Sequence, residues 1–182
     1  MQSTYLLPQP ESFSSCIILI GMAASGKSTI GNLLAKELDW AYLDSDHLIE
    51  AIYGHRLQDV TDKTDKTSFL NIECQVICSI RANRTVISTG GSVIYRKKAM
   101  THLKKLGTIV YLDVDLATIE KRIKNKPDRG LAIGPNQTIE DLFNERKALY
   151  ETWANIRCEC KNKKAKECVN WILQNIDIKK GP

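Results

Sequence analysis

The stretch Gly21–Thr29 has the residue types and spacing needed to bind a phosphate chain. It matches G-x-x-x-x-G-K-[ST], the P-loop, whose backbone N–H groups surround phosphates. Lys27 is spaced to reach the β- and γ-phosphates, and Ser28 offers a hydroxyl to Mg²⁺. The motif predicts that the following residues bind a nucleotide: Gly21, Ala23, Ala24, Ser25, Gly26, Lys27, Ser28 and Thr29.

The residues on either side predict the strand and the helix that a P-loop requires. Cys16–Ile20 is a short apolar run rich in β-branched residues, which is typical of a buried strand. After the loop, apolar side chains recur at helical spacing, at Ile30, Leu33, Leu34 and Leu38. This order of strand, glycine-containing loop and helix favours a phosphate site over a chance turn.

Strand and helix patterns alternate along the rest of the chain. We expect further strands at 40–44, 85–88, 108–112 and 157–160, and helices at 45–53, 67–81, 96–106, 116–124, 138–154 and 165–177. In the 45–53 helix, Leu48, Ile49 and Ile52 should face inward, and Gly54 should end the helix. Such alternation predicts an α/β fold with a mostly parallel sheet, helices on both faces, and ligands beyond the carboxyl ends of the strands.

Length and charge limit the classes of protein to consider. The chain has 182 residues, a net charge of +5 and a pI near 8.8. This weak basicity suits nucleotides and argues against nucleic acid as a partner. No apolar run has the length of a membrane span, and residues 1–14 lack the features of a signal peptide. We expect a flexible tail at 1–14, a single domain at 15–182, a cytoplasmic location and a monomer.

Six cysteines are present, at 16, 74, 78, 158, 160 and 168. In a cytosolic protein they are expected to be reduced rather than bridged. The spacing of Cys158, Cys160 and Cys168 matches no common zinc pattern, and no histidine lies near them. The sequence therefore favours packed or surface thiols at these positions.

Several short motifs, taken in order, resemble the shikimate kinase family from about Ile17 to Ile172. They are the P-loop, Leu43-Asp44-Ser45-Asp46 with Ile49-Glu50 and Gly54, Phe69 with Glu73, Thr89-Gly90-Gly91, Arg129, and Arg146-Lys147-Ala148-Leu149-Tyr150. The resemblance implies a three-layer P-loop kinase fold with a five-stranded parallel sheet and a lid loop at about 125–136. It also implies Mg²⁺ and ATP, whose γ-phosphate is transferred to a hydroxyl of a small carboxylated acceptor, shikimate.

The resemblance also implies roles for individual residues. Asp44 is expected to hold Mg²⁺ with Ser28, although the Asp44-Ser45-Asp46 stretch also fits a helix cap. Asp46 would bind the acceptor hydroxyl and act as base, and Lys27 would complete the catalytic groups together with Arg129 from the lid. The remaining implied contacts are Gly90, Gly91 and Arg146 with the acceptor, and Arg122 over the adenine.

The chain departs from the family pattern mainly on the acceptor side. Leu70 stands where the family has an arginine that grips the shikimate carboxylate, and Asp65-Lys66 replaces a Gly-Glu pair. Ala24 and Thr89 each replace a usual glycine. Either Lys66 compensates and shikimate is the acceptor, or Leu70 reshapes the pocket for a smaller hydroxy acid such as homoserine.

Three other functions compete with this interpretation. Asn125-Lys126-Pro127-Asp128 spells N-K-x-D, a guanine-binding motif, but the chain has no Asp-x-x-Gly and the motif follows a predicted helix. A GTPase is therefore disfavoured. The second alternative is a nucleotide-binding protein without turnover. The third is a kinase of the same fold that acts on homoserine or a sugar acid.

Overall fold

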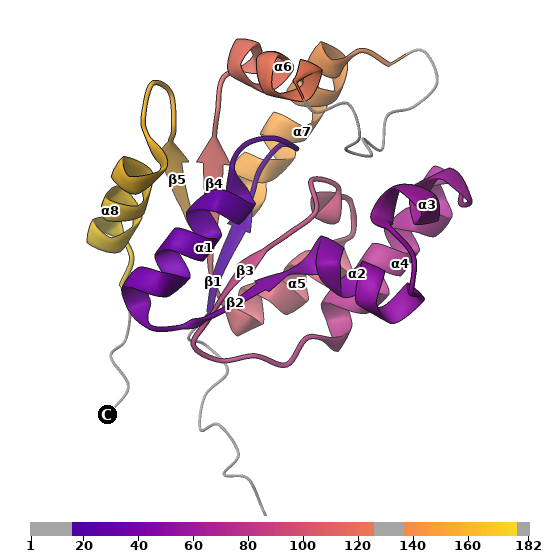
Figure 1. Cartoon of the computed structure of the whole chain (residues 1–182), viewed down its shortest axis with the longest axis horizontal. Coiled ribbons are helices and arrows are strands. Elements are labelled where there is room, and N and C mark those ends of the chain that lie inside the picture. Colours follow the sequence, from indigo (N-terminus) through magenta and orange to yellow (C-terminus); the bar gives the residue numbers. More distant parts are fainter. Residues whose placement is uncertain (1–15, 126–136, 178–182) are drawn as a thin grey trace, which may run out of the picture.

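The computed structural model describes residues 16–125 and 137–177 and shows a three-layer α/β arrangement (Figure 1). Five parallel strands form one sheet in the order β2-β3-β1-β4-β5. Their bounds are β1 Cys16–Ile20, β2 Ala41–Asp44, β3 Thr85–Ser88, β4 Gly107–Asp113 and β5 Ile156–Glu159. The predicted five-stranded parallel sheet is confirmed, with β1 fully buried at its centre.

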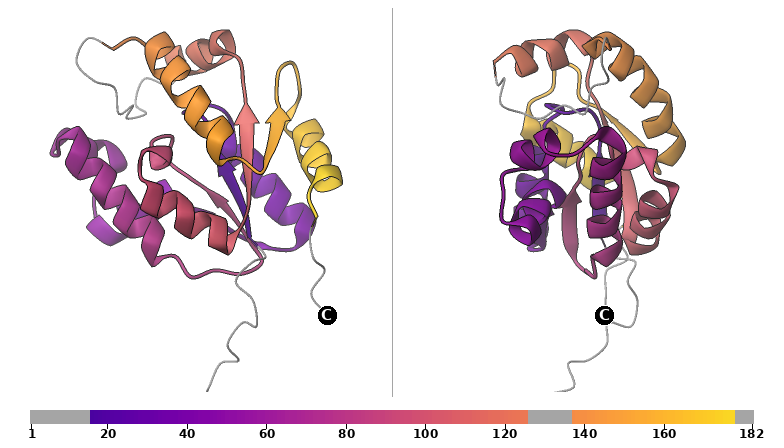
Figure 2. Two further views of the ribbon diagram at one scale, coloured as in Figure 1. Left: turned by 180° about the vertical axis from the view of Figure 1, so that it is seen from behind. Right: turned by 90° about the vertical axis from the view of Figure 1, so that its right-hand side faces the viewer.

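Helices cover both faces of the sheet. α1 (Lys27–Leu38) and α8 (Ala165–Asn175) lie on one face, and α5 (Lys97–Leu106) and α7 (Ile139–Trp153) lie on the other (Figures 1 and 2). Because both faces are covered, the central strands can be apolar along their whole length, as the sequence predicted.

A second group of helices lies beside the β2 edge of the sheet. It consists of α2 (Ser45–Tyr53), α3 (Leu57–Asp62) and α4 (Lys66–Ser79), which lie together on the right of Figure 1. The short 3-10 helix η1 (Val93–Tyr95) joins β3 to α5, and α6 (Leu116–Lys124) follows β4. The α2–α4 group therefore faces the P-loop across the carboxyl ends of β1, β2 and β3.

Local signals in the sequence account for the ends of several helices. Gly54 ends α2 with a left-handed φ of 66°, as predicted. Thr138 begins α7, where its hydroxyl and the Asp141 carboxylate form a reciprocal capping box. Asp44 caps α2 by accepting a hydrogen bond from the backbone N–H of Asp46 at 3.1 Å.

Ile52, which was predicted to face inward, is exposed, and so is Leu33 from the apolar pattern of α1. Ile52 is 55% exposed and Leu33 is 38% exposed. The prediction for Ile52 was wrong because α2 packs mainly against β2, α3 and α4 among the described residues, so its buried face is narrow and centred on Ile49. Helical spacing identifies an apolar face but does not fix how much of it a neighbour covers.

Some expectations concern residues beyond those described. The predicted tail at 1–14 lies outside the described residues, as do Arg129 and all of the expected lid except residue 125. Among the described residues, no helix is both long and apolar enough to cross a membrane.

Candidate active site

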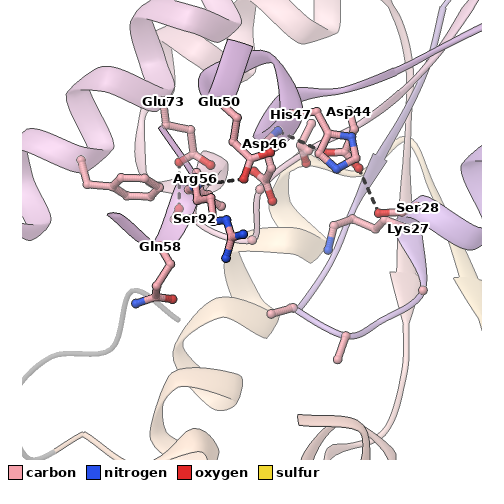
Figure 3. A pocket seen from close by; sticks show the side chains of 18 of the residues that line it. Lys27, Ser28, Asp44, Asp46, His47, Glu50, Arg56, Gln58, Glu73 and Ser92 are labelled. Carbon is pink, nitrogen blue, oxygen red and sulfur yellow. Dashed lines mark hydrogen bonds between the residues drawn. The ribbon is translucent and has the colours of Figure 1, made fainter. Parts of the chain in front are cut away.

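A cavity of about 690 Å³ opens where β1, β2 and β3 end, between the P-loop and the α2–α4 group (Figure 3). One wall contains P-loop residues, among them Lys27 and Ser28. The other wall contains carboxylates and a second cation, including Asp46, Glu73 and Arg146. A cavity with phosphate-binding groups on one side and titratable groups on the other suits a reaction between two ligands.

The P-loop has the backbone geometry that its glycines predicted. Gly21 and Gly26 have φ values of 146° and 100°, which side chains rarely tolerate. A Cβ on Gly21 would also approach the carbonyl oxygen of Leu112 to 2.9 Å. Ala24 has a left-handed φ of 63°, so the family's usual glycine would fit this position with less strain.

Lys27 is buried in the wall of the cavity. Its ammonium donates hydrogen bonds to the carbonyl oxygens of Gly21 and Met22, each at 2.8 Å. These bonds orient a positive charge at the place where the loop surrounds a phosphate chain. The structure thus holds Lys27 where the motif placed it.

Ser28 and Asp44 meet at the end of β2, although 16 positions separate them in the sequence. The Ser28 hydroxyl donates to Asp44 Oδ2 at 2.9 Å, and the Tyr42 hydroxyl donates to the same oxygen at 3.0 Å. A hydroxyl and a carboxylate are the hard oxygen donors that Mg²⁺ prefers. Asp44 also caps α2, so the capping and metal-binding interpretations are compatible.

Asp46 and Glu73 form a pair of carboxylates over Gly90. A Cβ on Gly90 would collide with Glu73 Oε1 and would lie 2.9 Å from Asp46 Oδ1, so glycine is needed here. Loss of solvation, with the nearby Asp44 charge, raises the pKa of Asp46 to about 6. Burial, with the Asp46 charge, raises the pKa of Glu73 to about 8. At neutral pH the pair therefore carries a proton, chiefly on Glu73.

Glu73 was a family cue in the sequence but was not predicted as a site residue. It comes from α4, is 1% exposed, and accepts a hydrogen bond from the Ser92 hydroxyl at 2.9 Å. Its other oxygen, Oε1, is buried and has no hydrogen-bond partner among the described residues. The available signal was a carboxylate between Phe69 and Val76 on the apolar face of the helix.

Arg146 reaches the cavity from α7 and is almost fully buried, at 1% exposure. Its Nε donates to the Tyr95 hydroxyl at 3.2 Å, and its guanidinium lies 5.4 Å from the centre of the Tyr95 ring. A Cβ on Gly91 would lie 3.0 Å from Arg146 Nη1. The structure therefore brings Arg146 and the Gly90-Gly91 pair to one wall.

Arg56 is a cavity residue that the sequence reasoning missed. It lies between α2 and α3, and its guanidinium extends into the cavity (Figure 3). Within residues 16–125 and 137–177, no hydrogen bond or ion pair engages that guanidinium. The only signal in the sequence was a basic residue two positions after Gly54.

Two residues weighed for the acceptor side lie elsewhere. Leu70 is 6% exposed on α4 and is not among the described residues lining the cavity. The Lys66 ammonium lies 5.5 Å from the centre of the Tyr95 ring and is also absent from the lining. Lys66 and Arg146 both lie against the Tyr95 ring, but of the two only Arg146 lines the cavity.

Arg122 lies on the other side of the P-loop. Its Nη1 donates to the carbonyl oxygen of Ala24 at 3.0 Å. A second cavity, of about 330 Å³, lies here between Arg122, the P-loop and the turn from β5 to α8. Ala24, Gly26 and Thr29 line both cavities, so the two cavities lie on either side of the P-loop.

These features together define the class of P-loop phosphotransferases: a parallel sheet, a P-loop, the Ser28–Asp44 pair and the carboxylates that face them. A family model described as shikimate kinase matches residues 23–177. The chain belongs to the shikimate kinase family.

Individual relatives agree with this assignment. A shikimate kinase of Sulfurihydrogenibium sp. is 37% identical over 161 residues, covering 88% of this chain and 96% of that protein. The structure of Acinetobacter baumannii shikimate kinase in complex with shikimate is similar, with a TM-score of 0.80 and 30% sequence identity. The match covers 88% of this chain and 92% of that one. Shikimate kinase from Aquifex aeolicus is similar with a TM-score of 0.75 and 31% sequence identity, over 87% of this chain and 94% of that one.

Proposed function

We propose that the protein is an ATP-dependent kinase that transfers the γ-phosphoryl group to a hydroxyl of shikimate. The observation that carries this proposal is the single cavity that contains Lys27, Asp46 and Arg146. These residues supply a phosphate-binding cation, a base for a hydroxyl and a partner for a carboxylate. The family membership independently favours the same reaction.

The donor nucleotide would lie along the P-loop. Its phosphates would accept hydrogen bonds from the loop N–H groups and from Lys27. Its base would enter the second cavity beside Arg122. Ser28 and Asp44 would hold Mg²⁺, which when bound neutralises charge on the β- and γ-phosphates.

Asp46 would orient the acceptor hydroxyl and take its proton. The hydroxyl oxygen forms a bond to the γ-phosphorus as the bond from that phosphorus to the β–γ bridging oxygen breaks, which releases ADP. The proton passes to Asp46, whose pKa of about 6 leaves it mostly ionised at neutral pH. Protonation below pH 6 removes this base, so kcat/KM should fall there.

Arg146 and Arg56 would together bind the acceptor carboxylate. Two cations lining one cavity suit an anionic group, and the Arg56 guanidinium has no competing partner in the described part of the chain. Arg56 would thereby supply the charge that the family pattern places at the position of Leu70. In this proposal Lys66 stays with Tyr95 and Leu70 only shapes α4 packing.

A comparison of acceptors tests the proposal. We expect purified protein with ATP and Mg²⁺ to phosphorylate shikimate with a higher kcat/KM than homoserine. Leu70→Arg should bring little gain, because Leu70 does not line the cavity. A preference for homoserine would overturn the acceptor while keeping the phosphotransferase. Absence of transfer to either acceptor, with nucleotide still bound, would favour the binding protein without turnover.

A further inference from the structure

Three cysteine side chains converge beneath the second cavity. Cys158 lies in β5, Cys160 follows the end of β5, and Cys168 lies in α8. Their sulfur atoms all lie within 4.8 Å of one another, and the Cys158 and Cys160 sulfurs are 3.9 Å apart. All three are buried, at 0%, 8% and 1% exposure. No other group of three or more metal-binding side chains comes together within residues 16–125 and 137–177.

The spacing of the sulfurs is close to that of a thiolate metal site. Sulfurs bonded to one metal at about 2.3 Å lie about 3.8–4.0 Å apart. The Cys158–Cys160 pair already has this separation, and the third sulfur needs only a small side-chain adjustment. The sequence argument against zinc used the linear spacing and the absence of a nearby histidine, and neither describes how close the three sulfurs lie in the folded chain.

Backbone hydrogen bonds hold the three positions in place. The N–H of Cys160 donates to the Asp113 carbonyl at 2.8 Å, which joins the end of β5 to β4. The N–H of Lys163 donates to the Cys160 carbonyl at 3.2 Å and closes the turn. The N–H of Cys168 donates to the Lys164 carbonyl at 3.2 Å at the start of α8. The sulfurs are therefore preorganised by a rigid turn.

Two of the three thiols also contact each other directly. The Cys160 thiol donates to the Cys158 carbonyl at 3.3 Å and lies 3.9 Å from the Cys158 sulfur. Thiolates are the forms that bind metals, so each thiol must lose its proton when an ion binds.

We propose that Cys158, Cys160 and Cys168 form a binding site for one soft, thiophilic cation, Zn²⁺ or Cu⁺. Each bound thiol releases its proton to solvent as the sulfur–metal bond forms. Cu⁺ is satisfied by three thiolates, whereas Zn²⁺ takes a fourth ligand, which a water molecule in the adjoining cavity supplies. Cys160 and Cys168 line that cavity, which gives the ion a path of entry.

The position of this site connects it to the nucleotide groove. The second cavity also includes Gly26 and Arg122 of the donor side. A metal ion would fix the β5–α8 turn that forms one wall of this cavity. We therefore expect metal binding to change the affinity for ATP, in addition to raising stability.

The test is a titration of the full-length, reduced, metal-free protein with Zn²⁺ and, under anaerobic conditions, with Cu⁺. We expect one ion per chain by native mass spectrometry, and slower alkylation of three of the six cysteines than in the metal-free protein. Cys160→Ser should weaken binding at least about tenfold. The matched control Cys74→Ser/Cys78→Ser removes two thiols from α4, away from the cluster, and should leave affinity unchanged.

The outcomes separate cleanly. One ion of either metal, lost in Cys160→Ser and kept in the control, supports the site. Absence of stoichiometric binding by both metals overturns it, as does equal binding by Cys160→Ser. Should Cys160→Ser fail to fold, the unmodified protein decides: thiolate-to-metal charge-transfer absorption with Co²⁺ or with Cu⁺ supports the site, and its absence with both ions overturns it.

Discussion

The donor and acceptor sides of the cavity are built in different ways. The donor side consists of one continuous loop, residues 21–28, joined by Asp44 from the next strand. The acceptor side draws Arg56, Glu73, Gly90 and Arg146 from four separate segments. A short motif can specify the first because local backbone geometry makes the site. The second exists only when distant segments pack together.

The two sides also differ in how their charges are satisfied. On the donor side, Asp44 accepts hydrogen bonds from Ser28, Tyr42 and the backbone of Asp46. On the acceptor side, burial raises the pKa of Glu73, and its Oε1 has no hydrogen-bond partner in the part of the chain that the structure describes. A buried carboxyl oxygen without a partner is costly. The missing hydrogen bond therefore destabilises the acceptor side, and a bound hydroxyl group that donates to this oxygen would remove the cost.

Removing Lys27 should break the donor side with the largest effect. Lys27→Ala loses a cation aimed at the transferring phosphate, so kcat/KM should fall roughly 10³-fold or more with the fold retained. Steady-state kinetics and circular dichroism measure the two effects. The control Lys36→Ala changes an exposed lysine of the same helix and should have normal activity. Near-normal turnover in folded Lys27→Ala would falsify the assigned phosphate site.

Removing Arg56 should damage only the acceptor side. Losing one charge-assisted hydrogen-bond partner costs about 1.5–3 kcal/mol, roughly ten- to a hundredfold in kcat/KM for shikimate. The KM for ATP should stay constant, because Arg56 lies across the cavity from the P-loop. Lys63→Ala, an exposed cation just after α3, serves as the control. An unchanged KM for shikimate in Arg56→Ala would remove Arg56 from the carboxylate site.

Glu73→Gln should change how the free energy of unfolding depends on pH, because it removes the buried carboxyl group. The pKa of Glu73 is raised from 4.5 to about 8 in the folded protein, so its proton is lost from the unfolded chain first. The stability of the unmodified protein should therefore fall as the pH rises from about 4.5 to about 8. Glu73→Gln lacks this loss and should be more stable at pH 8 by about 2 kcal/mol. Urea unfolding at pH 5 and pH 8 measures the difference, and equal gains at both pH values would contradict it.

Ala24→Gly tests whether the donor-side loop is strained, and it should have the smallest effect of these substitutions. Ala24 has a left-handed φ of 63°, which costs a non-glycine residue about 1 kcal/mol. Glycine removes this strain but adds entropy to the unfolded chain, so a gain of no more than about 1 kcal/mol is expected. Ala51→Gly, on the exposed face of α2, should instead destabilise by about 0.5–1 kcal/mol. Loss of stability in Ala24→Gly would show that the loop carries no such strain.

Much of the architecture was predictable because it depends on short-range patterns. The strand Thr85–Ser88 and the helix Leu116–Lys124 were predicted with their observed bounds, and Gly54 ends α2 as expected. Apolar periodicity, capping residues and glycine φ preferences act over a few positions, so they can be read without the fold. Ile52 was misjudged because burial also depends on which neighbour covers the face.

The sequence by itself determined the P-loop, the parallel sheet and the positions of Asp44 and Asp46 at the end of β2, since each follows from local residue order. Only the tertiary structure decided that Arg56 enters the cavity while Leu70 does not line it. It also brought together the sulfurs of residues 158, 160 and 168. The physical reason is that side-chain proximity between segments depends on packing angles and helix placement, which linear spacing does not encode.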